Sequence, residues 1–200
     1  MPRNTRTLIL NADYQAFGVI SWKRAVILSF INLEDSNKGL KIIEHYCDDI
    51  IHSQYESYNV PAVGVSPFFI KQHKQTVPFS RKNVFIRDGL TCAYCHKQFP
   101  PNELEYDHLH PRSKYPNEKG GPTHWLNIVS CCKRCNRIKA DKTLKECGFM
   151  LLKQPIIPKA SSFVRGITPW QVLPDVWLKY LPKHYVDINQ KFCYRKNMPT

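Results

Sequence analysis

The chain has 200 residues, and its 29 Lys and Arg against 16 Asp and Glu give a formal net charge of +13. Hydrophobic residues make up 42% and charged residues 22%, which is ordinary for a globular protein and excludes a fully disordered chain. The mean hydropathy is −0.42, and no apolar run approaches the roughly 20 residues of a membrane helix, so we expect no membrane span. No apolar stretch of signal-peptide type follows residues 1–6, so we expect a cytoplasmic protein.

The basic residues are concentrated in the middle and the end of the chain. Residues 1–78 are nearly neutral, whereas residues 79–154 hold 14 Lys and Arg against 7 Asp and Glu, and residues 155–200 hold 7 against 2. We expect three parts with these bounds: an N-terminal α+β lobe, a central domain, and a proline-punctuated arm packed on the body. A strongly basic surface attracts polyanions, so nucleic acid is the expected partner.

Residues 1–78 have the pattern of a small α+β unit. Thr7–Leu10 is expected to form a strand, and Ser21 can cap a helix from Trp22 to about Leu33. Leu40–Tyr46 and Val60–Val65 are further strand candidates. The helix carries large apolar residues on one face, which we expect to pack in the core. They are Trp22, Val26, Phe30 and Leu33.

Two C-x-x-C pairs dominate the central domain. Cys92 with Cys95 and Cys132 with Cys135 supply four thiols, which is the usual ligand set of a structural Zn²⁺. Cys131 competes with Cys132, and we prefer Cys132 because it restores the two-residue gap. The 36 residues between the pairs exceed the spacing of a simple zinc ribbon, so a structure must be built between them.

Other readings of the cysteines are weaker. The string Cys92-Ala93-Tyr94-Cys95-His96 also fits a c-type haem attachment site, but that reading requires export and leaves the second pair without a role. A thioredoxin-like redox site is disfavoured because neither pair follows a clear strand of a βαβ unit.

The insert between the cysteine pairs predicts a hairpin followed by a helix. Leu104–His108 is expected to be a strand that ends in a carboxylate and an imidazole, and Leu126–Ser130 to be the returning strand. A helix from Cys132 to about Lys139 carries Asn136. With zinc holding the ends of the insert together, Asp107, His108 and Asn136 should converge.

These residues resemble the HNH endonucleases, which have a ββα-metal fold. The resemblance covers residues 80–142 and rests on several motifs in one order. They are Arg81-x-x-Val84-x-x-Arg87-Asp88, the first cysteine pair, Asp107-His108, Gly120-Gly121-x-x-x-Trp125-x-Asn127, and the second cysteine pair followed by Asn136-x-x-Lys139. The N-terminal segment around Leu8–Tyr14 and Ser21-Trp22 resembles the lead-in of a bacterial and phage subgroup, though less specifically. Asn136 stands where the last His of the family name occurs, as in many zinc-bearing members.

The resemblance implies a set of roles. Asp107 and Asn136 would ligate one Mg²⁺ or Mn²⁺, His108 would be the general base, and Asn127 would brace the loop after His108. The products would be a 5′-phosphate and a 3′-hydroxyl. His110 is the alternative base, disfavoured because it lies beyond the expected strand end.

Double-stranded DNA is the implied substrate, and basic residues near the two cysteine pairs are the candidate phosphate contacts. Ser80 can cap a short helix that presents two of them. The set comprises Arg81, Lys82, Arg87, Arg112, Lys133, Arg134, Arg137 and Lys139, with Lys139 the foremost candidate near the scissile phosphate. A non-catalytic zinc module that binds nucleic acid is the alternative function. A homodimer, or a phage or bacterial protein partner, is left open.

The C-terminal segment 155–200 contains six prolines and several large apolar residues. We expect an irregular arm with a helical turn around Asp175–Tyr180, docked on the body because Trp170 and Trp177 would be costly to expose.

Overall fold

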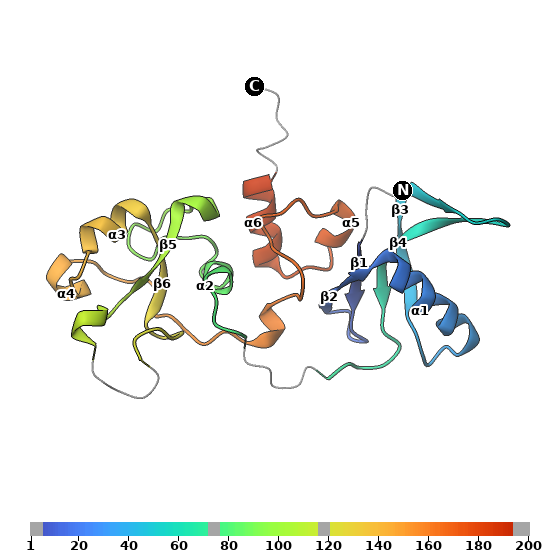
Figure 1. The fold of residues 1–200 in the computed structure, drawn as a ribbon, viewed down its shortest axis with the longest axis horizontal. Coiled ribbons are helices and arrows are strands. Elements are labelled where there is room, and N and C mark those ends of the chain that lie inside the picture. Colours follow the sequence, from blue (N-terminus) through green and yellow to red (C-terminus); the bar gives the residue numbers. More distant parts are fainter. Residues whose placement is uncertain (1–5, 72–76, 116–120, 194–200) are drawn as a thin grey trace, which may run out of the picture. The chain divides into compact units, whose positions relative to one another are not determined.

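The computed structural model describes residues 6–71, 77–115 and 121–193 (Figure 1). The chain separates into two compact units, one of Met1–His73 with Ser161–Thr200 and one of Lys74–Ala160. The C-terminal segment thus lies largely in the same unit as the N-terminal segment. Within the described ranges, no helix has the length and apolar character needed to cross a membrane.

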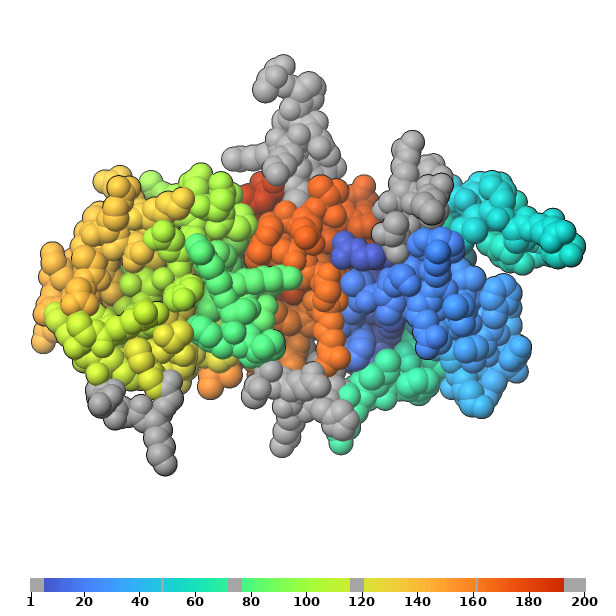
Figure 2. All heavy atoms as spheres, in the orientation of Figure 1, coloured from blue at the N-terminus to red at the C-terminus, as the bar shows by residue number. Residues whose placement is uncertain are grey.

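The first unit contains a mixed four-stranded sheet. Its strands are β1 (Arg6–Leu10), β2 (Ala16–Ser21), β3 (Lys41–His52) and β4 (Ser57–Val65), in the order β2-β1-β4-β3. β1 pairs antiparallel with β2 and parallel with β4, and β3 pairs antiparallel with β4. The tip of the β3–β4 hairpin extends beyond the sheet (cyan in Figures 1 and 2), and Tyr55 at this tip is exposed.

Helix α1 (Trp22–Glu34) begins where the sequence predicted, because the Ser21 hydroxyl accepts a hydrogen bond from the backbone N–H of Arg24 at 3.3 Å. The predicted core face of this helix is only partly right, because Trp22 and Val26 are half-buried but Phe30 and Leu33 are exposed. Ala25 is the fully buried residue, whereas Phe30 is 46% and Leu33 80% exposed. The buried face of the helix therefore centres on Ala25, and Phe30 and Leu33 lie outside it.

The C-terminal segment docks on the sheet of its own unit. α5 (Asp175–Leu178) realises the expected helical turn, and Trp177 is buried with its indole N–H donating to the carbonyl of Ala62 on β4 at 2.8 Å. α6 (Lys183–Cys193) was not expected from the sequence. Its Tyr185 is fully buried, and the Tyr185 hydroxyl accepts a hydrogen bond from the backbone N–H of Val164. A 3-10 turn at Ala160–Ser162 (η3) begins the segment.

The second unit has a ββα core. β5 (Leu104–His108) pairs antiparallel with β6 (Ile128–Cys132), with Leu104 opposite Cys132 and His108 opposite Ile128. α3 (Lys133–Lys139) follows directly on β6, and its N-cap is Cys132. α2 (Arg81–Arg87) precedes the hairpin and α4 (Leu144–Cys147) follows it. Two 3-10 turns, η1 (Pro101–Glu103) and η2 (Arg112–Lys114), flank β5.

Helix α2 is capped by Ser80, as predicted, and is fastened to β6 by Arg87. The Arg87 guanidinium donates to the carbonyls of Trp125 and Ile128, each at 2.7 Å, and pairs with Asp88. Asp88 in turn accepts hydrogen bonds from the backbone N–H and hydroxyl of Ser130, both at 2.8 Å. Since the Arg87 side chain is only 4% exposed, its prediction as a phosphate contact is wrong, and Arg87 holds the fold together instead.

Candidate active site

The four cysteines of the two C-x-x-C pairs converge. Their sulfur atoms lie within 4.8 Å of one another, and Cys92, Cys132 and Cys135 are buried while Cys95 is partly exposed. Cys132 ends β6 and Cys135 lies in the first turn of α3, so the second pair spans the junction of this strand and helix. The first pair, Cys92 and Cys95, meets it there. Four thiols at this spacing fit a structural Zn²⁺.

Cys131 is buried but lies outside this group. Successive strand residues point to opposite faces, so Cys131 cannot share the direction of Cys132. Burial, helped by the nearby Asp107 carboxylate, raises the pKa of the Cys131 thiol, which favours its neutral form. The preference for Cys132 as a ligand therefore agrees with the structure.

Asp107 lies one residue before the end of β5 and is held by two donors. Its Oδ2 accepts from the Tyr94 hydroxyl at 2.5 Å and lies 2.8 Å from the ammonium of Lys139. Tyr94 lies between Cys92 and Cys95 in the chain and is buried. Its ring stacks on that of Phe149, with the ring centroids 4.9 Å apart. The segment of the first cysteine pair thereby contacts the Asp107 carboxylate.

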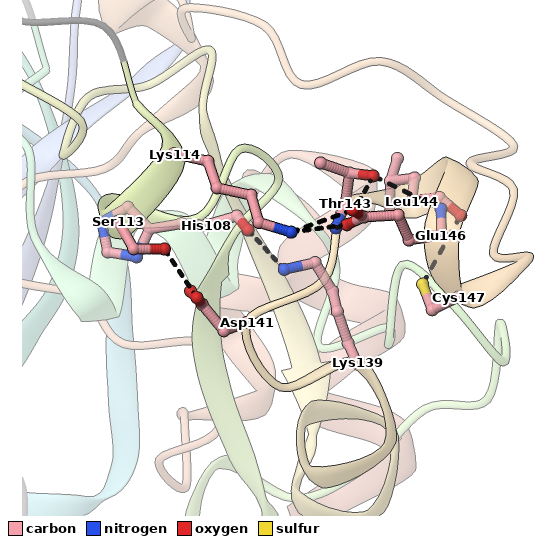
Figure 3. Close-up of polar contacts among 9 residues, drawn as sticks. All are labelled: His108, Ser113, Lys114, Lys139, Asp141, Thr143, Leu144, Glu146 and Cys147. Atoms are coloured by element: carbon pink, nitrogen blue, oxygen red, sulfur yellow. Dashed lines mark hydrogen bonds and ion pairs between the residues drawn. The ribbon is translucent and has the colours of Figure 1, made fainter.

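Lys139 is fully buried, which contradicts its prediction as a phosphate contact. Its ammonium donates to the backbone carbonyl of His108 at 2.6 Å (Figure 3). The same ammonium pairs with Asp107, so Lys139 joins α3 to the end of β5. A buried ammonium needs such partners because an unpaired buried charge is very costly. Lys139 therefore fixes the position of the Asp107-His108 pair.

We expect Lys139→Met to lower the free energy of unfolding by about 3–5 kcal/mol, because the substitution leaves the Asp107 carboxylate half-buried without its counter-charge. Urea unfolding followed by circular dichroism measures the change. Lys142→Met, at an exposed position just beyond α3, is the matched control and should change stability little. Equal stability of the two variants would contradict the structural role of Lys139.

His108 ends β5 and is 9% exposed. Its Nε2 lies 2.9 Å from the hydroxyl oxygen of Thr123 and 3.4 Å from Nε of Arg112. Burial is the main cause that lowers the pKa of His108, and the Arg112 cation adds to it, while Asp107 opposes. A lowered pKa keeps this imidazole neutral at pH 7, the form that can accept a proton.

Asn127 holds the loop that follows His108. Its Oδ1 accepts from the backbone N–H of His110 at 2.9 Å, and its Nδ2 donates to the carbonyl of Pro122 at 2.8 Å and to that of His110 at 3.2 Å. This is the geometry that a bracing residue requires. His110 meets Asn127 through its backbone and leaves its side chain exposed. Gly120 of the sequence motif lies outside the described residues.

Asn136 lies on α3 opposite the middle of β5. Its Nδ2 donates to Oε2 of Glu105 at 2.7 Å. The two predicted cation ligands, Asp107 and Asn136, thus lie along one strand–helix interface, where each is engaged by a different neighbour. Sequence reasoning missed Glu105, although strand alternation places it on the same face as Asp107. It also missed Tyr94 and Thr123.

The loop after β5 is tied to the segment that follows α3 (Figure 3). The Ser113 hydroxyl donates to Asp141 at 2.6 Å, and the Lys114 ammonium contacts both carboxylate oxygens of Glu146, at 2.8 and 3.0 Å. Lys114, followed by the Thr143 donors, lowers the pKa of Glu146 to about 2. These contacts hold η2, which carries Arg112, beside His108.

The remaining predicted phosphate contacts lie at the surface. Arg81 is exposed but donates to the carbonyl of Leu104 at 2.6 Å, so part of its guanidinium is engaged in the fold. The other exposed members of the set are Lys82 on α2, Arg112 on η2, and Lys133, Arg134 and Arg137 on α3. The second unit therefore carries exposed cations on α2, η2 and α3, where a polyanion can reach them.

Comparison with known families adds independent findings. Residues 92–152 match the family described as HNH endonuclease, and residues 7–63 match the family described as HNH endonuclease-associated, N-terminal domain. The first match begins at Cys92 and spans β5, β6, α3 and α4, so it contains the four cysteines and Asp107, His108, Asn127 and Asn136, but not the cations of α2. The second match spans most of the four-stranded sheet and α1. A search of curated proteins found no match.

Proposed function

Since this chain belongs to the HNH endonuclease family, we propose that it is a metal-dependent endonuclease that hydrolyses phosphodiester bonds of double-stranded DNA. The observation that carries the proposal is the arrangement at the end of β5. There the buried His108 follows Asp107 in the chain, and the Asp107 carboxylate pairs with Lys139 on the helix that also bears Asn136.

The donor set fits a hard divalent cation. Tyr94 and Lys139 both engage Oδ2 of Asp107, and Glu105 engages Nδ2 of Asn136, which leaves Oδ1 of Asp107 and Oδ1 of Asn136 as candidate ligands. Carboxylate and amide oxygens are ligands that Mg²⁺ and Mn²⁺ accept. A cation held there would supply charge stabilisation on the scissile phosphate and on the departing 3′ oxygen.

His108 is the proposed general base. The Nε–H of Arg112 donates to Nε2 of His108 at 3.4 Å, so Nε2 is the acceptor nitrogen of the neutral imidazole, and it is the atom that would take a proton from the attacking water. Asn127 keeps the following loop in place, and the Lys139 bond to the His108 carbonyl fixes the backbone that carries the imidazole. Attack by water with departure of the 3′ oxygen leaves 5′-phosphate and 3′-hydroxyl ends.

The exposed cations would hold the DNA backbone. Lys133, Arg134 and Arg137 project from α3, and Arg112 lies within reach of His108. Contacts of this kind position a duplex without reading its sequence. We therefore propose that the second unit binds DNA mainly through phosphates, with an affinity that falls steeply as salt rises.

Cleavage of supercoiled plasmid tests the proposed function. We expect nicking or linearisation with Mg²⁺ or Mn²⁺ in the zinc-loaded protein, no cleavage without added divalent cation, and cut ends that T4 DNA ligase reseals without prior phosphorylation. Resealing requires a 5′-phosphate beside a 3′-hydroxyl, so it checks the product ends. Salt-sensitive DNA binding with no cleavage under any divalent cation would instead identify a non-catalytic zinc module.

A further inference from the structure

We infer that Glu105 is a positioning residue of the proposed cation site: its carboxylate fixes the orientation of the Asn136 amide and adds negative charge beside the ligands. The inference deepens the proposed function and rests on it. It concerns a residue that lies two positions before Asp107 in the sequence and that the ligand set proposed above does not include.

The first support is the register between β5 and α3. Glu105 and Asp107 are alternate residues of one strand and therefore share a face, and Asn136 and Lys139 are three apart on α3 and share a side of the helix. The side-chain contacts between β5 and α3 follow this register, with one contact for each pair of residues. Glu105 meets Asn136 at 2.7 Å, and Asp107 meets Lys139 at 2.8 Å. Glu105 is thus placed at the same interface as both proposed ligands.

The second support is the chemistry of the Glu105–Asn136 hydrogen bond. An ionised carboxylate only accepts hydrogen bonds, so the side of the Asn136 amide that faces Glu105 must be its NH₂ group. The amide oxygen then points away from Glu105 and is free to ligate. A flipped amide would turn NH₂ toward the cation, and NH₂ cannot act as a ligand. The Glu105 carboxylate therefore selects the one orientation of Asn136 that is compatible with cation binding.

The third support is the charge balance of the interface. The Asp107 carboxylate is paired with the Lys139 ammonium, and Asn136 is neutral, so these three residues together carry no net charge. Among the described residues, Glu105 forms no ion pair with a Lys, Arg or His side chain. Glu105 consequently gives the interface its net negative charge, and a divalent cation is held more tightly by a site of net negative charge.

Cation binding to three variants of the zinc-loaded full chain tests the inference. Glu105→Ala removes both the acceptor and the charge, Glu105→Gln keeps an acceptor oxygen but loses the charge, and Glu103→Gln makes the same charge change two residues away in η1. Electron paramagnetic resonance of free Mn²⁺ gives the dissociation constant without DNA. The Mg²⁺ concentration for half-maximal plasmid cleavage and the rate at saturating Mg²⁺ are measured in parallel.

For Glu105→Ala we expect the Mn²⁺ dissociation constant and the half-maximal Mg²⁺ concentration to rise about 10–100-fold. The rate at saturating Mg²⁺ should recover much of the wild-type value, because His108 is untouched. Glu105→Gln should fall between Glu105→Ala and wild type, and Glu103→Gln should stay close to wild type. Zinc content and the thermal midpoint show whether each variant folds, and Glu105→Gln decides the matter if Glu105→Ala does not fold.

Wild-type Mn²⁺ affinity in both Glu105 variants, with cleavage intact, would overturn the inference and leave the proposed function standing. A loss in Glu103→Gln as large as that in Glu105→Gln would also overturn it, because the effect would then be one of general charge. Failure of the wild-type protein to cleave with any divalent cation would instead remove the proposed function on which the inference rests.

Discussion

His108→Ala is expected to reduce the rate of plasmid cleavage about 10²–10⁴-fold while DNA binding is retained. The substitution removes the imidazole that would accept the proton of the attacking water, but it changes none of the exposed cations that would contact phosphates. Single-turnover cleavage with Mg²⁺ measures the rate, and fluorescence anisotropy of a labelled duplex without divalent cation measures binding. Wild-type cleavage by this variant would refute the assignment of the base.

His110→Ala distinguishes the two histidines of the loop. His110 is exposed, and the contacts it makes with Asn127 come from its backbone, so the substitution preserves them. If His110→Ala abolishes cleavage and His108→Ala does not, the base is His110.

The dependence of the cleavage rate on pH gives a further check on the assignment of His108. Because the pKa of His108 is lowered, the rate should rise with pH with a midpoint below the ordinary 6.5 and stay level at higher pH, where the imidazole is neutral.

Local signals in the sequence predicted most of the ββα core. β5 has the expected bounds Leu104–His108 because its alternating pattern is ended by a loop of Pro and polar residues. The returning strand, Ile128–Cys132, starts and ends two residues later than expected, since pairing with β5 rather than apolar content sets its limits. The cysteine spacing identified the four thiols that converge, because a tetrahedral ion constrains ligand spacing strongly.

Local sequence signals could not predict which charged residues are buried and which are exposed. Lys139 and Arg87 carry the same formal charge as Arg134 and Arg137, yet the first two are inside the fold and the last two are at the surface. The difference arises from partners distant in sequence, such as Asp107 and the carbonyls of Trp125 and Ile128, which only folding brings near. Glu105 escaped notice for the same reason, since its partner Asn136 lies on another element.

The zinc site and the candidate active site are built on the same elements. Tyr94, between the first two cysteines, donates to Asp107, and Cys132 ends the strand that pairs with β5 and serves as the N-cap of the helix that carries Asn136. The second unit also buries several of its cysteines in one cluster with Tyr94 and Val129. Loss of a zinc ion from the four thiols would therefore affect Asp107 and Asn136, the proposed cation ligands, directly.

Removal of zinc is accordingly expected to unfold the second unit and abolish cleavage, with no recovery on addition of excess Mg²⁺ alone. Binding of structural Zn²⁺ contributes about 10–16 kcal/mol in small zinc domains at pH 7, which exceeds the stability of most domains of this size. Cys132→Ser should reproduce the effect, whereas Cys147→Ser, at a cysteine outside the group of four, should leave zinc content unchanged. Zinc analysis, proteolysis of the second unit and cleavage before and after Zn²⁺ is restored measure the outcome. A zinc-free protein that still cleaves DNA would contradict this prediction. It would show that the ββα core keeps Asp107 and Asn136 in place without the zinc ion.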